Sequence, residues 1–168
     1  LQELDRLLAP DVETTAVVIS AITGTAGVGK TALAVHWAHR VRDRFPDGQL
    51  YANLRATQGP QSDPGDVLAS FLRALGVDGS AIPIAREERE GLYRTRLADR
   101  RVLVLLDDAA NEAQVRPLLP GGSGAAVLVT SRAPLMGLDG AHLLSLEVFE
   151  LGEALQLLER LIGPQRIA

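Results

Sequence analysis

Eight consecutive residues combine three glycines with a lysine and two threonines, a composition suited to binding phosphate. In order they are Gly24, Thr25, Ala26, Gly27, Val28, Gly29, Lys30 and Thr31. This spacing matches the P-loop pattern, in which glycines allow backbone N–H groups to surround an anion. A helix that begins near Lys30 would add its positive N-terminal end. We therefore expect the whole motif to bind the phosphates of a nucleotide.

Lys30 is the only lysine in the chain, whereas the other sixteen of its seventeen basic residues are arginines. A single ammonium among so many guanidinium groups indicates a point charge at a tight site. We expect Lys30 to reach the β- and γ-phosphates and the Thr31 hydroxyl to bind Mg²⁺. The alternative is a glycine-rich turn that only joins a strand to a helix. Such a turn would give no reason for the single lysine to lie at position 30.

Two adjacent carboxylates, Asp107 and Asp108, end an apolar run at residues 101–108. P-loop ATPases keep the acid that supports Mg²⁺ at such a strand end, so Asp107 is predicted to take that role. Because adjacent strand residues point to different sides, Asp108 is predicted to orient or deprotonate an attacking water. The alternative for Asp108 is an N-terminal cap of the helix that follows.

A further apolar run, residues 126–132, also ends in polar side chains. Arg132 is predicted to contact the γ-phosphate and so to distinguish ATP from ADP, with an exposed loop arginine as the alternative. Thr130 is predicted to share that contact more weakly. Arg55, after an earlier apolar run, is a further candidate for a phosphate contact.

The alternation of strand and helix patterns defines the fold class. Strands are expected at residues 16–22, 49–54, 101–108, 126–132 and 142–148, and helices at 1–9, 30–45, 65–75, 84–99, 111–119 and 151–162. Wholly apolar strands between helices predict an α/β fold, a mainly parallel sheet of about five strands with helices on both faces. This is the three-layer arrangement of P-loop NTPases. Ligands bind beyond the carboxyl ends of such strands, where the motifs above converge.

Composition excludes several classes of protein. The length of 168 residues fits about one domain, and 46% hydrophobic residues are enough for a core. The absence of cysteine excludes disulfides, zinc–thiolate sites and a cysteine nucleophile. The chain has no membrane-length apolar run and no secretion signal, so we expect it to be cytoplasmic. A net charge of −4 predicts no direct DNA contact by this segment.

Two histidines and a tryptophan lie on the helix expected at residues 30–45. His36 and His39 are three residues apart, but no acidic or thiol ligand lies nearby in the sequence, so no metal site is expected there. Trp37 is expected to lie in the core.

Four segments together resemble the nucleotide-binding subdomain of the STAND class of ATPases, specifically the NB-ARC type. They are residues 24–31, 45–54, 102–108 and 118–132. The amino-acid sequences at residues 45–48 and 120–122 most resemble those of bacterial members, which lie within larger transcriptional regulators.

The resemblance implies a division into a nucleotide-binding domain at residues 1–150 and the truncated start of a helical subdomain at 151–168. It also implies phosphate and Mg²⁺ binding by Lys30 and Thr31, metal support by Asp107, catalysis by Asp108 and γ-phosphate sensing by Arg132. Family segments with the patterns aromatic-Val-Gly-Arg, Gly-x-Pro and Met-His-Asp are missing. We therefore expect a piece of a longer protein with an incomplete adenine pocket, whose partners are other domains of that chain.

The function expected from these features is an ATP/ADP-dependent regulatory switch with slow Mg²⁺-dependent hydrolysis and nucleotide-dependent self-assembly. The alternatives are a P-loop kinase, with Asp108 as base for a small acceptor, and a module that holds ADP without turnover. A GTPase of the usual kind needs an Asn-Lys-x-Asp segment, and the single lysine is already placed at position 30. An ATP-binding-cassette domain needs a Leu-Ser-Gly-Gly-Gln segment, which is absent.

Overall fold

The computed structural model of the protein describes residues 4, 5, 18–57 and 59–146. The strands are β1 (Val18–Gly24), β2 (Gln49–Asn53), β3 (Leu103–Ala109), β4 (Ala126–Ser131) and β5 (Ala141–Leu146). The helices are α2 (Lys30–Arg40), α3 (Pro64–Ala74), α4 (Arg86–Leu97) and α5 (Glu112–Val115), with 3-10 turns η1 (Arg42–Arg44), η2 (Gly79–Ala81) and η3 (Arg116–Leu118). The helices expected at 1–9 and 151–162, and the domain boundary at 150, lie wholly or mostly outside the described residues.

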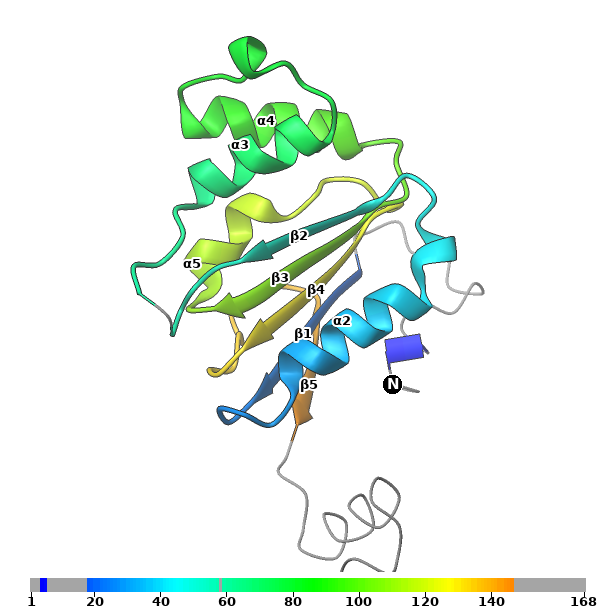
Figure 1. Cartoon of the computed structure of the whole chain (residues 1–168), viewed down its shortest axis with the longest axis vertical. Helices are drawn as coiled ribbons and strands as arrows, with labels where there is room; N and C mark the ends of the chain where they lie inside the picture. The colour runs from blue at the N-terminus through cyan, green and yellow to red at the C-terminus, as the bar shows by residue number, and fades with distance from the viewer. Residues whose placement is uncertain (1–3, 6–17, 58, 147–168) are drawn as a thin grey trace, which may run out of the picture.

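The five strands form one sheet in the order β2-β3-β4-β1-β5, with every neighbouring pair parallel (Figure 1). Side chains alternate between its faces because the strand period is two residues. Leu103 and Leu105 of β3 pack in the core under α2, whereas Val104 and Leu106 pack in the core under α3 and α4. The sheet is therefore the middle of three layers, and the predicted fold class is confirmed.

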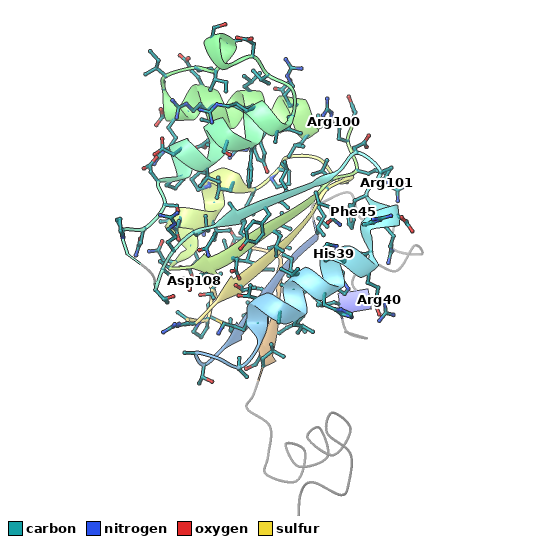
Figure 2. The ribbon with its side chains drawn as sticks, in the orientation of Figure 1. His39, Arg40, Phe45, Arg100, Arg101 and Asp108 are labelled. Atoms are coloured by element: carbon teal, nitrogen blue, oxygen red, sulfur yellow. The ribbon has the colours of Figure 1, made fainter. Side chains whose placement is uncertain are left out.

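All five carboxyl ends meet at one edge of the sheet because the strands are parallel. Thr23 of β1 pairs with Ser131 of β4, and Asn53 of β2 pairs with Asp107 of β3. Figure 2 shows Asp108 at this edge, while Arg100 and Arg101 lie at the opposite end of the sheet. The polar strand ends are thereby gathered on one side.

The helix expected at residues 30–45 is shorter than predicted, because α2 ends at Arg40 and the turn η1 follows. Trp37, Val41 and Phe45 are all buried in the core under α2, and their spacing of four imitates a continuous helix. Pro46 follows Phe45, and the residue before a proline disfavours the α conformation. A 3-10 turn keeps Phe45 in the core without extending the α-helix.

The helix expected at residues 111–119 is likewise split into α5 and the 3-10 turn η3. Pro117 has no N–H to donate to an i−4 carbonyl, so the α pattern ends before it. The helices expected at 65–75 and 84–99 are confirmed as α3 and α4. On α4 the carboxylate of Glu90 forms i,i+4 ion pairs with Arg86 and Arg94, at 3.5 Å each, on a half-exposed face. Within the described residues, no helix is long and apolar enough to cross a membrane.

A buried hydroxyl provides a test of packing on the α3–α4 face. Tyr93 is fully buried, and its hydroxyl donates a 3.0 Å hydrogen bond to the Leu118 carbonyl. We expect Tyr93→Phe to lower the free energy of unfolding by about 1–2 kcal/mol, because the carbonyl loses its buried partner. Chemical denaturation would measure this loss. Thr95→Val is the control, since the exposed Thr95 hydroxyl bonds the Gly91 carbonyl of its own helix and its removal should change stability little. Equal effects of the two substitutions would contradict this account of the Tyr93 hydrogen bond.

Candidate functional site

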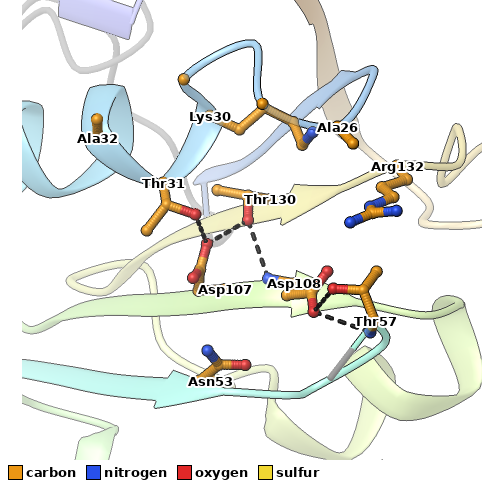
Figure 3. Close-up of a pocket in the computed structure, with 12 residues that line it drawn as sticks. Ala26, Lys30, Thr31, Ala32, Asn53, Thr57, Asp107, Asp108, Thr130 and Arg132 are labelled. Carbon is orange, nitrogen blue, oxygen red and sulfur yellow. Dashed lines mark hydrogen bonds between the residues drawn. The ribbon is translucent and has the colours of Figure 1, made fainter. Parts of the chain in front are cut away.

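A pocket of about 340 Å³ opens at the carboxyl edge of the sheet (Figure 3). Its walls come from the loop after β1, the start of α2 and the ends of β2, β3 and β4. The residues that line it are Ala26, Gly27, Gly29, Lys30, Thr31, Ala32, Asn53, Thr57, Asp107, Asp108, Thr130 and Arg132. Segments that are far apart in the sequence therefore form a single site.

The loop between β1 and α2 has the backbone that its glycines permit. Gly27 and Gly29 have φ angles of 78° and 95°, in the left-handed region where other residues are strained. The ammonium of Lys30 donates to the carbonyls of Gly24 and Thr25, at 2.8 and 2.7 Å. The lysine thus folds back along the loop, with its charge beside the pocket.

Two cations face this pocket. Burial lowers the pKa of Lys30, and repulsion from Arg132 lowers it further, while Asp108 and Asp107 act in the opposite direction. The guanidinium of Arg132 points into the pocket in Figure 3, although its residue is exposed overall. These two cations can bind phosphate oxygens, while the carboxylates of Asp107 and Asp108 that also line the cavity balance their charge. A nucleoside triphosphate would therefore need a bound cation as well as these two groups.

Asp107 is the most buried acid of the site, at 4% exposure, and its carboxylate is surrounded by hydroxyl donors. Thr31 Oγ1 donates to Asp107 Oδ1 at 2.8 Å, and Thr130 Oγ1 donates to the same oxygen at 2.5 Å. The hydroxyl of Tyr51 donates to Oδ2 at 3.5 Å, and burial followed by the charge of Asp107 raises the pKa of Tyr51. Asp107 is therefore held in one orientation.

The adjacent oxygens of Thr31 and Asp107 fit Mg²⁺. This cation prefers oxygen ligands and is usually bound by one or two protein groups together with substrate phosphates and waters. Nowhere in the described part of the chain do three His, Cys, Asp or Glu side chains form a metal-binding group. A hydroxyl and a carboxylate beside a phosphate loop suit Mg²⁺ bound together with a nucleotide, because this cation takes its remaining ligands from phosphates and waters.

The end of β3 departs from regular strand geometry at the two aspartates. The β3–β4 register shifts between Leu106 and Ala109, and Asp108 has a φ of 53°. The N–H of Asp108 donates to Thr130 Oγ1 at 3.0 Å instead of to a strand carbonyl. This bulge turns the Asp108 carboxylate away from that of Asp107, so the two acids have different surroundings.

Asp108 is not the N-terminal cap of α5, which was the alternative role considered for it. The side chain of Asn111 caps α5 by accepting from the N–H of Gln114 at 3.1 Å. The carboxylate of Asp108 instead lies against Thr57 and lines the pocket. Asp108 is thus available for a role at the site.

The structure brings most of the predicted site residues together, but not all of them. Gly24, Thr25 and Val28 do not line the pocket; the carbonyls of Gly24 and Thr25 hold Lys30 instead. A side chain at Gly24 would clash with the Leu146 carbonyl, so this glycine allows β5 to approach closely. Thr130, predicted to contact the γ-phosphate, lines the pocket, but its hydroxyl donates its single proton to Asp107.

Other candidates lie outside the pocket. Arg55 lines a separate groove of about 510 Å³ between β2 and α3. His36 and His39 are exposed on α2, whereas Trp37 is buried as predicted.

Sequence reasoning missed three lining residues, Ala32, Asn53 and Thr57, of which Ala32 directly follows the predicted motif on α2. Asn53 is the last residue of β2, and Asp107 lies near the end of β3. A search for polar residues at the ends of apolar strands would therefore have identified Asn53. Thr57 follows β2 in a loop, and nothing in its local sequence indicates that it contacts Asp108.

A parallel sheet of this order, with a phosphate loop after β1 and acids at the end of β3, is the fold of a P-loop NTPase. A family model described as the NB-ARC domain matches residues 2–167. The chain belongs to the NB-ARC family of nucleotide-binding modules.

Relatives with known names support this assignment. Regulatory protein AfsR from Streptomyces griseus is 54% identical over 149 residues, which cover 89% of this chain and 15% of AfsR. AfsR from Streptomyces coelicolor is 55% identical over 150 residues, with the same coverage. Disease resistance-like protein DSC1 from Arabidopsis thaliana is 31% identical over 139 residues, or 79% of this chain and 11% of DSC1. The chain thus spans only a small part of each relative.

Solved structures resemble the fold at low sequence identity. Cdc6p from Pyrobaculum aerophilum has a TM-score of 0.69 and 17% identity, covering 94% of this chain and 46% of that chain. The Aeropyrum pernix ORC1 protein, solved in complex with DNA, has a TM-score of 0.62 and 18% identity, covering 95% and 47%. This likeness establishes the shared architecture.

Proposed function

We propose that the chain is an ATP/ADP-dependent switch that hydrolyses ATP slowly with Mg²⁺ and controls a larger regulatory protein. The observation that carries the proposal is the contact of Thr31 with Asp107, at 2.8 Å, in the pocket that also contains Lys30 and Arg132. This set combines two phosphate-binding cations with a hydroxyl and a carboxylate suited to Mg²⁺. A binding site for phosphate alone would not need the metal-binding pair.

Each side chain would have a separate task in the proposed reaction. The ammonium of Lys30 would exchange its loop carbonyls for β- and γ-phosphate oxygens, and the P-loop N–H groups would bind the remaining oxygens. Thr31 and Asp107 would hold Mg²⁺, which when bound neutralises charge on the phosphate oxygens. Asp108 would orient the attacking water and accept its proton. Arg132 would bind the γ-phosphoryl group and register its loss.

The consequence of hydrolysis would be regulatory. Loss of the γ-phosphate removes the group that Arg132 is proposed to bind, so the two nucleotide states would favour different arrangements of neighbouring domains. Relatives in Streptomyces that are named regulatory proteins are much longer than this chain. We propose that the module acts in the cytoplasm within such a longer chain, with other domains and other copies as its partners.

Calorimetric titration with MgATP, MgADP, MgGTP and metal-free ATP would test this function. We expect the chain to bind both adenine nucleotides in preference to MgGTP, and ATP more weakly when EDTA removes the metal. Equal affinity for GTP would contradict an adenine switch. Equal affinity with and without Mg²⁺ would contradict the metal role of Thr31 and Asp107.

A further inference from the structure

Thr57 makes two hydrogen bonds to the acid proposed to activate water. Its backbone N–H donates to Asp108 Oδ2 at 3.0 Å, and its side-chain Oγ1 donates to the same oxygen at 2.7 Å (Figure 3). Hydrogen bonds to an ionised acceptor are shorter and stronger than neutral ones. These two bonds fix the position of one carboxylate oxygen.

The segment that presents Thr57 is itself tied to the end of β3. The N–H of Leu54 donates to the Asp107 carbonyl at 2.7 Å, and the N–H of Ala56 donates to the Asp108 carbonyl at 2.9 Å. Between them Arg55 has a φ of 56°, in the left-handed region that a residue with a side chain adopts only when its surroundings require it. Residues 54–57 therefore run alongside the bulge in β3, which places Thr57 next to Asp108.

The contact is polar and is not needed to fill the core. Thr57 is exposed, Asp108 is partly buried, and both line the pocket. Both hydrogen bonds fall on Oδ2, and within the described part of the chain Oδ1 accepts none. One carboxylate oxygen is thus anchored to the loop after β2, and the other can accept a proton from water.

We propose that Thr57 is a positioning residue that orients the carboxylate of Asp108 for hydrolysis and contributes little to nucleotide affinity. This inference rests on the proposed role of Asp108. Removal of the Thr57 hydroxyl would leave only the N–H bond, and the carboxylate would rotate among orientations that do not face the water. Because alignment of the base determines the rate of proton transfer, the effect should fall on kcat and not on KM.

Steady-state ATP hydrolysis by Thr57→Val and Thr57→Ser would test this. Valine keeps the shape of threonine without its hydroxyl, so kcat is expected to fall about tenfold with KM unchanged. Serine restores the hydroxyl and should return kcat to within about twofold of the native chain. Thr95→Val is the matched control, since the exposed Thr95 hydroxyl donates to the Gly91 carbonyl of its own helix α4, away from the pocket. It should leave both parameters unchanged.

The double variant Thr57→Val/Asp108→Asn separates positioning from a general effect on folding. If Thr57 acts through Asp108, the valine substitution should cost nothing further once Asp108 is asparagine. An unchanged kcat in Thr57→Val, a raised kcat, or an additive loss in the double variant would each overturn the inference.

A nucleotide-free measurement distinguishes failure of this inference from failure of the proposed function. The amide proton resonance of Thr57 should shift upfield when Asp108→Ala removes the acceptor, which NMR can detect without turnover. Absence of that shift would overturn the contact itself. If the shift occurs but the native chain binds MgATP without hydrolysing it, the proposed turnover is wrong and the positioning role is lost with it.

Discussion

Substitution of Lys30 by alanine is expected to weaken MgATP binding about 100-fold, or about 2.8 kcal/mol. Hydrogen bonds between charged groups contribute more than neutral ones, and Lys30 would make several to the β- and γ-phosphates. Its present partners, the carbonyls of Gly24 and Thr25, are neutral and belong to the glycine loop at the surface. The loss should therefore appear in binding far more than in folding stability. Calorimetric titration beside thermal unfolding would measure both.

Lys30→Arg is the informative control because it keeps the charge. A planar guanidinium is wider than an ammonium, and the chain uses arginine at every other basic position. We expect Lys30→Arg to lose most of the affinity as well. Native affinity in the arginine variant would show that charge alone is sufficient. Native affinity in the alanine variant would remove Lys30 from the phosphate site.

Asp108→Asn is expected to slow ATP hydrolysis by about 10²- to 10⁴-fold, the usual contribution of a general base. Asparagine is nearly isosteric and tolerates the left-handed conformation that Asp108 adopts, with a φ of 53°. Its amide oxygen can still accept from Thr57. The bulge should therefore be preserved while the ability to take a proton is lost. Nucleotide binding should stay within a few-fold of the native chain.

Phosphate release in a single turnover would measure the loss of hydrolysis, with nucleotide binding recorded on the same samples. Asp139→Asn is the control, since Asp139 is 96% exposed and forms only a 3.8 Å ion pair with Arg116. Equal rates for the native chain and Asp108→Asn would exclude Asp108 as the base. If the native chain also retained ADP without turnover, a nucleotide-holding module would replace the switch.

The fold was predictable because its signals are local and repeated. Each of β3 and β4 is a short apolar run buried on both faces, and that pattern is typical of a parallel sheet covered by helices. Helix ends were less predictable. The core positions Trp37, Val41 and Phe45 continue the helical spacing through a 3-10 turn, so periodicity alone could not show where α2 ends.

Most of the pocket was predictable because motif spacing and strand ends place Lys30, Thr31 and Asp107 at one edge of the sheet. The contacts of Asp108 were not. They depend on a register shift between β3 and β4 and on a loop that crosses from β2, and both are set by pairings between distant segments. The contact of Thr57 with Asp108 was not predictable for the same reason, because it depends on a partner 51 residues away and not on neighbours in sequence.

The place of β1 in the sheet has a consequence for the order in which the chain can fold. β1 precedes the other strands in the sequence yet lies between β4 and β5, with Val18 paired to Ala126 and Ile19 to Ala141. During synthesis, the strand that carries the phosphate loop therefore has no partner within the described sheet until β4 emerges, and its second partner, β5, comes later still. Pairings this distant in sequence form slowly, and unpaired apolar strands are prone to aggregation. Nucleotide can stabilise this module only after nearly the whole described chain has been made.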